Sequence, residues 1–400
     1  MKKIIILSFD LEIGGVERSL IGLLNAIDYS RYAVDLFLYA HEGEFMDMIP
    51  PEVNLLPEIK PYSMFEKPIV EVFRRTCWHV GLVRVLSKLA IFIKSKAIRN
   101  VQGSLMSYYC RYSLPFLPRI SDIRYDLAIS FLEPHHFITK VQAKKTIAWI
   151  HTDYSNTSID EKLERKMWDK FNYIAAVSED CKKIFVRKFP ELENKVLVIE
   201  NILSPQFVYD QADADVSGEM PDEAGVLKIC TVGRFSTAKG FDNAVLMCKK
   251  LIDMGCKTRW YAVGYGGDEP LIRAKIKETG MEENFIILGK KTNPYPYIKA
   301  CDIYVQPSRH EGKAVTVREA QILTKPVVIT NCATAQSQLQ NGYDGMIVPM
   351  DIDNCAKGIA AIIEDEALLE KLISNTKQLD YGNENEVEKI YRLIEEAEIG

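Results

Sequence analysis

The 400-residue sequence lacks any apolar run that approaches the roughly 20 residues needed by a bilayer-spanning helix. It also lacks a C-x-x-C pair, because its nine cysteines are scattered and mostly lie inside apolar runs such as KICTVG. That distribution is typical of reduced cysteines that pack in a core. No secretory signal is expected, since the first apolar run covers only Ile4–Leu7 and acids follow at Asp10 and Glu12. These absences predict a cytoplasmic protein that is soluble or at most peripheral to a membrane.

The sequence also lacks an excess of basic residues, with 50 Lys plus Arg against 55 Asp plus Glu and a net charge of −5. Nothing in the global charge therefore indicates a nucleic-acid partner. The chain has no P-loop, and Gly264-x-Gly266-Gly267 does not have the spacing of a dinucleotide-binding fingerprint, so NAD binding is not favoured. What the chain does have is an apolar content of 47%, which at this length predicts two or three domains with proper cores.

Short apolar strands alternate with helical stripes through both halves of the chain. The first half opens with a strand at Lys2–Ser8, a glycine turn and a helix over Ser19–Ile27, and the second half restarts with a strand at Leu227–Val232. A polar, acidic stretch from Ser204 to Ala224 is interpreted as the linker between them. We therefore predict an α/β protein of two doubly wound, Rossmann-like domains facing a central cleft. The expected domains are 1–203 and 204–381, with the helix at about 382–400 packing back on the first.

The stretch PSRHEGKAVTVREAQ places two carboxylates, Glu311 and Glu319, across the start of an expected helix. Apolar strands are expected on either side, within 301–308 and 325–331, so this is a βαβ unit whose loop and helix N-terminus belong to a ligand-binding edge. Carboxylates repel phosphate but accept hydrogen bonds from hydroxyls. The pair thus indicates a sugar or ribose ligand. The alternative is that Glu311 caps the helix and Glu319 is solvated.

The loop after the strand at Leu227–Val232 carries two cations, Arg234 and Lys239, just before a helix expected from about Phe241 to Met254. Two cations at a helix N-terminus suit a diphosphate. Two ordinary surface cations remain the alternative interpretation.

Two further stretches have ambiguous patterns. From 71 to 100 the chain mixes seven basic residues with many apolar ones and has one acid, Glu71, which fits either contact with anionic lipid or packed helices with snorkelling side chains. Asp213-Ala214-Asp215 spells a D-x-D, but it lies in the polar linker, so a metal role is not favoured.

Together the stretches GGVERSL, VGRFSTAKGFD and EGKAVTVREAQ resemble the retaining glycosyltransferases of family 4, which have the GT-B fold. The likeness spans nearly the whole chain, and NPYPYIKACDIYVQPS and KPVVITN extend it. It implies a nucleotide-diphosphate-sugar donor in the C-terminal domain, an acceptor in the N-terminal domain, retention of the anomeric configuration, and no cofactor or metal. The stretches TIAWIHTDY and PSRHEGKAVTVREAQ resemble sequences of bacterial enzymes that build capsular or other surface glycans on lipid carriers.

By their positions in the matching motifs, the resemblance implies that Arg234 and Lys239 bind the donor diphosphate. It places Glu311 on the donor sugar, Glu319 on the ribose, and His151 beside the reacting sugar, although a core or capping role for His151 is also open. The remaining expected binding positions are glycine-loop and helix-start residues: Gly14, Gly15, Gly233, Gly289, Lys290, Gly312, Lys313, Ala314 and Val315. The chain departs from the family at Gly312-Lys313-Ala314, where Gly-Phe-Gly is common, so the sugar is not specified.

The expected activity is transfer of a hexose-type sugar, with UDP as the expected nucleotide, to a glycan or lipid-linked saccharide at the inner face of the cell membrane. Two alternatives remain. One is a sugar-nucleotide epimerase of the same architecture, which needs no acceptor surface. The other is a non-catalytic glycan-assembly partner that binds a nucleotide sugar as a scaffold.

Overall fold

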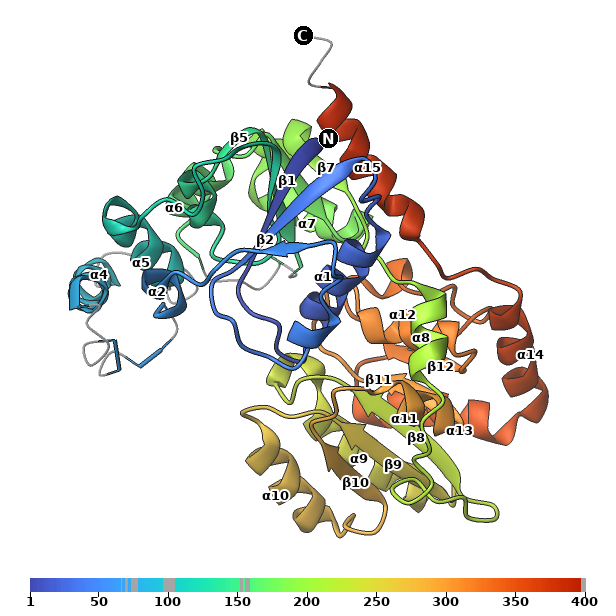
Figure 1. Cartoon of the computed structure of the whole chain (residues 1–400). Helices are drawn as coiled ribbons and strands as arrows, with labels where there is room; N and C mark the ends of the chain where they lie inside the picture. Colours follow the sequence, from blue (N-terminus) through green and yellow to red (C-terminus); the bar gives the residue numbers. More distant parts are fainter. Residues whose placement is uncertain are drawn as a thin grey trace. The chain divides into compact units, whose positions relative to one another are not determined.

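The computed structural model describes residues 1–65, 67–68, 71–72, 78–95, 105–151, 154 and 159–396. The chain divides into two compact units. The N-terminal unit comprises Met1–Glu12, Val16–Glu200 and Asn385–Gly400, and the C-terminal unit comprises Ile13–Gly15 and Asn201–Glu384. Each unit is built on one parallel sheet (Figure 1).

In the N-terminal unit, seven strands pair in the order β3-β2-β1-β4-β5-β6-β7, all parallel. The strands are β1 (Lys2–Ser8), β2 (Tyr32–Leu38), β3 (Asn54–Leu55), β4 (Arg124–Ser130), β5 (Gln142–Ile150), β6 (Tyr173–Ala176) and β7 (Val196–Val198). The α-helices among the described residues of this unit are α1 (Gly15–Ala26), α2 (Lys60–Ser63), α4 (Trp78–Ser95), α5 (Leu105–Ser113), α6 (Glu161–Trp168), α7 (Glu179–Lys188) and α15 (Val387–Glu395).

Helix α15 lies near the end of the chain and packs against β2 and the turn that precedes it. The Tyr391 ring stacks on Tyr32 with centroids 4.4 Å apart, and the Tyr391 hydroxyl accepts from the Asp28 N–H at 2.7 Å. These contacts attach α15 to the N-terminal unit.

In the C-terminal unit, six strands pair in the order β10-β9-β8-β11-β12-β13, again all parallel. The strands are β8 (Leu227–Val232), β9 (Thr258–Val263), β10 (Phe285–Gly289), β11 (Ile303–Gln306), β12 (Val327–Thr330) and β13 (Met346–Val348). The helices are α8 (Pro205–Gln211), α9 (Phe241–Asp253), α10 (Glu269–Thr279), α11 (Tyr295–Ala300), α12 (Val315–Ile322), α13 (Ile352–Glu364) and α14 (Glu366–Lys377).

Successive side chains of a strand point to opposite faces, so a parallel sheet covered on both faces needs two apolar layers. Strand β9 shows this alternation: Trp260 and Ala262 join the cluster packed with α9 and α13, while Tyr261 and Val263 join the cluster packed with α8, α11 and α12. The continuous apolar runs of the sequence are therefore strands buried on both sides. The predicted α/β fold with two Rossmann-like doubly wound sheets is confirmed.

The expected linker at 204–224 is wrong. Helix α8 lies within it, and Val208, Ala212 and Met220 are at most 2% exposed. The Tyr209 hydroxyl donates to the Ile322 carbonyl at 2.8 Å. The stretch has few apolar residues, but those few fill the C-terminal core, which composition alone did not reveal.

Candidate active site

Strand order locates the binding edge of the C-terminal unit. Connections from β8 run toward β9 and β10, whereas those from β11 run toward β12 and β13. Such a reversal opens a crevice at the carboxyl ends of the two central strands, where ligands of doubly wound sheets bind. The loops at this crevice are 233–240 after β8 and 307–314 after β11. These two loops carry seven of the fourteen residues that the sequence predicted.

An ion pair joins the two loops. Lys239 Nζ lies 2.6 Å from each carboxylate oxygen of Glu311, whose side chain is 6% exposed while that of Lys239 is 28% exposed. Because 72 residues separate them, only the fold brings them together. The pair places a cation and a hydroxyl-accepting carboxylate side by side at the crevice.

Arg234 is the second predicted cation, and it is exposed. It makes no hydrogen bond or ion pair with any part of the chain that the structure describes, so its charge is available to a ligand. Nearby, Gly289 ends β10 with φ +77°, its carbonyl accepts from the Gly264 N–H at 2.9 Å, and Lys290 lies over the Tyr265 ring at 4.7 Å. Lys290 is thus a further exposed cation on the loop after β10.

Helix α12 begins at Val315, directly after the 307–314 loop. Ala314 occupies the N-cap position without a side-chain cap, and its N–H donates to Gln338 Oε1 at 3.1 Å. Gly312 is buried and Lys313 is half-buried. The alternative in which Glu311 caps this helix and Glu319 is solvated is wrong.

Glu319 lies on α12 and is 0% exposed, with its Oε1 accepting from the Tyr295 hydroxyl at 3.1 Å. A buried carboxylate is stable only with hydrogen-bond partners, which explains the contact with the tyrosine. Its predicted contact with a ribose remains a prediction.

Arg309 was not among the residues predicted from the sequence, yet it links the loops 233–240 and 307–314. Its guanidinium makes a bidentate pair with Asp242 at 2.7 and 2.8 Å and also donates to Asn243 Oδ1 and the Thr237 carbonyl. Burial alone raises the pKa of Asp242, but hydrogen bonding and the charge of Arg309 lower it overall. The only sequence signal was its place two residues before Glu311 in PSRHEG, since its partners lie 66 to 72 residues away.

Three glycines are required by close backbone approaches at this edge. At Gly240, where φ is +69°, an added Cβ would lie 2.1 Å from the Pro307 carbonyl oxygen. At Gly264 and Gly266 it would lie 1.9 Å and 2.3 Å from the backbone oxygens of Gly233 and Phe235. The Gly264-x-Gly266-Gly267 run therefore lets two loops pack, whereas a Cβ at Gly233 itself would make only ordinary contacts, the nearest at 3.5 Å.

In the N-terminal unit the corresponding reversal lies between β1 and β4. Gly14 lies on the loop after β1 and Gly15 is the first residue of α1, although both group with the C-terminal unit. A Cβ at Gly15 would meet no atom within 4 Å, so the surrounding protein leaves room at that position.

His151 follows β5, and its Nε2 lies 3.0 Å from the Phe131 carbonyl, which makes Nε2 the protonated nitrogen. Burial lowers the pKa of His151 to about 4, so the ring is neutral near pH 7. Its Nδ1 is inaccessible to solvent and has no hydrogen-bond partner among the described residues. The predicted role beside a sugar stays a prediction, because that nitrogen is covered here.

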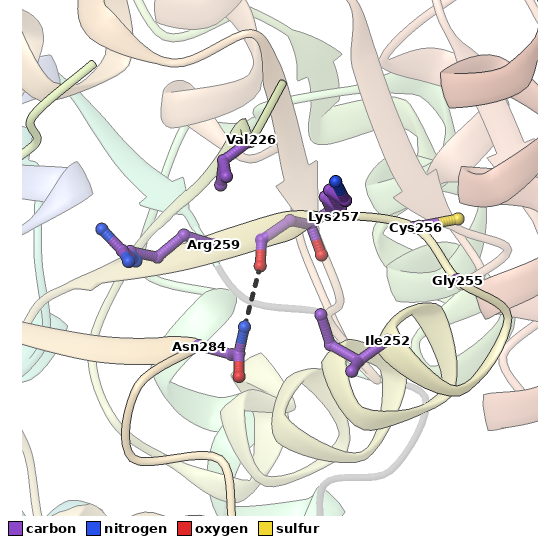
Figure 2. Close-up of a pocket in the computed structure, with 8 residues that line it drawn as sticks. Val226, Ile252, Gly255, Cys256, Lys257, Arg259 and Asn284 are labelled. Atoms are coloured by element: carbon purple, nitrogen blue, oxygen red, sulfur yellow. Dashed lines mark hydrogen bonds between the residues drawn. The ribbon is translucent and has the colours of Figure 1, made fainter. Parts of the chain in front are cut away.

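A pocket of about 240 Å³ lies elsewhere in the C-terminal unit (Figure 2). Its lining includes Ile252, Lys257 and Arg259, and the Asn284 amide donates to the Thr258 carbonyl at 3.3 Å. Thr258 is the first residue of β9, so the pocket lies at the amino edge of the sheet. At about 3.3 Å per residue, it is roughly 17 Å from the end of β9, and it is not the predicted site.

The D-x-D residues have protein partners. Asp213 forms an ion pair with Lys299 at 2.6 Å, and Asp215 accepts from the Ser217 N–H at 2.9 Å. Across the described residues, no three His, Cys, Asp or Glu side chains gather as metal ligands do.

Comparison with solved structures identifies the fold class. The chain superposes on Anabaena HepE in complex with UDP and glucose with a TM-score of 0.69 at 17% identity, covering 99% of this chain and 100% of that chain. It superposes equally on a Staphylococcus aureus TarM mutant in complex with fondaparinux, alpha-GlcNAc-glycerol and UDP, with a TM-score of 0.69 at 13% identity and coverage of 98% and 100%. The architecture is GT-B.

Comparison of sequences finds a family match over part of the chain. Residues 221–379, within the C-terminal unit, match the model for glycosyl transferases group 1. The chain is 26% identical over 215 residues to N-acetylgalactosamine-N,N'-diacetylbacillosaminyl-diphospho-undecaprenol 4-alpha-N-acetylgalactosaminyltransferase of Campylobacter jejuni, covering 53% of this chain and 56% of that protein. It is 24% identical over 212 residues to the capsular polysaccharide biosynthesis glycosyltransferase CapM of Staphylococcus aureus, with coverage of 51% and 56%. The chain thus spans about half the length of these relatives.

Proposed function

We propose that the protein is a retaining glycosyltransferase of bacterial surface polysaccharide biosynthesis. It moves a hexose-type sugar from a nucleotide-diphosphate sugar, with UDP as the favoured nucleotide, to a glycan or lipid-linked saccharide. The observation that carries this proposal is the pairing of Lys239 with Glu311 across the crevice of a group 1 domain, with Arg234 exposed on the same loop. Support for the acceptor comes from relatives whose names include diphospho-undecaprenol and capsular polysaccharide.

The proposed chemistry uses these groups directly. Cleavage of the glycosyl–phosphate bond places negative charge on the leaving diphosphate, which Arg234 and Lys239 stabilise. Glu311 accepts hydrogen bonds from the sugar hydroxyls as the ring gains oxocarbenium character. The acceptor hydroxyl forms the new bond to the anomeric carbon on the face that the diphosphate leaves. A diphosphate oxygen takes the hydroxyl proton, so the configuration is retained.

The purified protein, incubated with a panel of nucleotide sugars with and without a polyprenol-diphosphate saccharide, tests the proposal. Release of nucleoside diphosphate together with a lengthened acceptor is expected, and NMR of the product bond reports its anomeric configuration. An epimerase would change the sugar without an acceptor. A non-catalytic partner would bind a nucleotide sugar without releasing nucleoside diphosphate. Either of these two results contradicts the proposal.

Transfer is expected to need no divalent metal, because two cationic side chains are placed to neutralise the diphosphate. Activity in excess chelator should therefore remain within about twofold of the untreated rate. A rate that disappears with chelator and returns with manganese contradicts this expectation.

We further propose that helix α4 holds the protein on an anionic membrane. Four large apolar residues at helical spacing, three or four positions apart, form one exposed stripe on the described part of α4: Leu82 (47% exposed), Val85 (44%), Leu86 (53%) and Leu89 (56%). On the opposite face Arg84 is 8% exposed, donates to the Met64 and Lys67 carbonyls, and lies over the Tyr109 ring. The helix is thus anchored inward by a cation and presents leucines outward.

The occupant we infer is a lipid surface, because the stretch 71–100 carries six basic residues besides the inward-facing Arg84, against one acid. Part of that stretch, including Arg74, Arg75 and Lys96, lies outside the described residues. Within the described chain, no helix has the length and apolarity to cross a bilayer, so the proposed contact is peripheral.

Replacing Leu82, Leu86 and Leu89 together by serine is expected to lower partition onto anionic vesicles at least tenfold. Half-burying one leucine contributes roughly 1 kcal/mol, and about 1.4 kcal/mol is a factor of ten. Sedimentation with phosphatidylglycerol vesicles measures this, and wild-type binding should weaken as salt rises. Leu271→Ser, at a position 50% exposed on α10, is the matched control. Equal losses in both variants would mean that the binding is nonspecific. If the wild type sediments without lipid and the serine variant does not, the stripe mediates self-association instead of membrane binding.

A further inference from the structure

Gln306 is a buried polar residue in an otherwise apolar strand. It ends β11, is 2% exposed, and lies directly before the 307–314 loop. Its amide makes four hydrogen bonds. Oε1 accepts from the Tyr304 hydroxyl at 2.7 Å and the Thr316 hydroxyl at 3.2 Å, while Nε2 donates to Ser308 Oγ at 2.9 Å and Glu311 Oε1 at 3.2 Å. Two acceptor sites and two donor hydrogens are the full capacity of an amide, so every one is used.

The orientation of this amide follows from the charge of its partner. An ionised carboxylate only accepts hydrogen bonds, so the NH₂ side of Gln306 must face Glu311. The opposite orientation would place the amide oxygen against a carboxylate oxygen. Ser308 extends the same chain of bonds, because its hydroxyl accepts from Gln306 and donates to Glu311 Oε1 at 2.6 Å.

The two oxygens of Glu311 therefore have different surroundings. Oε1 accepts from Gln306, from Ser308 and from Lys239, whereas Oε2 accepts from Lys239 at 2.6 Å. If a bound diphosphate displaced Lys239 from Glu311, Oε1 would still accept hydrogen bonds from Gln306 and Ser308, whereas Oε2 would be free to accept one from a ligand.

We propose that Gln306 is a positioning residue for Glu311. With Ser308, it holds Oε1 so that Oε2 is the oxygen presented to the hydroxyls of a bound ligand. The identity of that ligand as a donor sugar rests on the proposed function, whereas the positioning itself rests on these contacts.

The ionisable groups around this network come from several elements. Lys239 approaches from the 233–240 loop, Tyr304 from β11 and Cys332 from the segment after β12, and Glu319 on α12 interacts with Tyr304. Burial raises the pKa values of Tyr304 and Cys332. Both groups stay neutral between pH 5 and 8. The charges that act on a carboxyl introduced at 306 are therefore mainly those of Glu311 and Lys239.

A stability cycle tests the contact without any assay of transfer. Gln306→Glu keeps the shape but sets a second carboxyl about 3 Å from Glu311, and two such groups cannot both ionise freely. The folded protein then binds a proton more tightly than the unfolded chain, whose glutamates titrate near pH 4.3. The deficit in melting temperature relative to wild type should thus be smallest near pH 5 and grow toward pH 8.

The matched background is Glu311→Gln, which removes the like charge. In that background, the melting-temperature deficit caused by Gln306→Glu should lose at least half of its pH dependence. An equal pH-dependent deficit in both backgrounds overturns the proposal, because Gln306 would then not act through Glu311.

Steady-state kinetics tests the consequence for the ligand. Gln306→Met, which removes both donors at similar volume, should lower kcat roughly tenfold while UDP affinity by calorimetry stays within about twofold. The activity of Gln306→Glu relative to that of the wild type should rise about tenfold as the pH is lowered from 8 to 6. A purely structural role would lower stability but leave Gln306→Glu with the wild-type pH profile, and that result overturns the proposal. A wild-type protein that transfers no sugar contradicts the proposed function instead, and the stability cycle still decides the role of Gln306.

Discussion

Replacing Lys239 by alanine is expected to lower the rate of sugar transfer by about 10²–10³, the usual effect of losing one preorganised group that stabilises transition-state charge. Lys239 lies 2.6 Å from both oxygens of Glu311 at the crevice, where a diphosphate would sit against the cation. Arg234→Ala should lower the rate by a similar factor. The measurement is kcat and KM for the donor, with nucleoside diphosphate release as the signal.

The two variants should differ in stability, which separates catalysis from folding. Arg234 is exposed and has no described partner, so Arg234→Ala should leave the melting temperature unchanged. Lys239→Ala removes the cation beside a carboxylate that is 6% exposed, which costs about 1–3 kcal/mol. Lys249→Ala, on α9 with its own partner Asp253, is the control and should retain full activity. A loss below tenfold in both site variants would mean that other groups neutralise the diphosphate.

Removing the two glutamates is expected to damage different parts of donor binding. Glu311→Ala should leave the affinity for the bare nucleoside diphosphate within about twofold and lower turnover ten- to hundredfold, because its partner hydroxyls occur only on the sugar. Glu319→Ala should weaken both the donor and the nucleoside diphosphate ten- to hundredfold, since both contain the ribose. Each loss corresponds to one charge-assisted hydrogen bond of about 1.5–3 kcal/mol.

Calorimetry with the nucleoside diphosphate distinguishes the two roles. Glu319 is 0% exposed, so Glu319→Gln is included because it keeps the volume and an acceptor for Tyr295. Glu278→Ala, on α10 and 68% exposed in its side chain, is the control for loss of a carboxylate. If Glu311→Ala weakens nucleoside diphosphate binding as much as Glu319→Ala does, the two assignments are wrong.

Local signals in the sequence were sufficient for much of the fold. The strands at Lys2–Ser8 and Leu227–Val232 occur with the predicted bounds, because parallel strands buried on both faces are apolar throughout and their ends are marked by glycine or polar residues. The loops of Lys239 and Glu311 were likewise placed correctly, since each directly follows such a strand. Composition failed at 204–224, where three buried side chains among many polar ones suffice to fold the segment onto the core.

The sequence by itself determined that two alternating strand–helix halves each present loops at one edge, and which loops carry cations and carboxylates, because these features depend on neighbours a few residues apart. Only the tertiary structure decided that Lys239 contacts Glu311, that Arg309 braces Asp242, that Gln306 uses all four of its hydrogen-bonding sites, and that α4 turns Arg84 inward and its leucines outward. The Lys239 and Arg309 contacts join residues 67 to 72 positions apart, and the outward face of α4 depends on what packs beneath it. Strand order and helix packing set these distances, and neither is encoded in the local pattern.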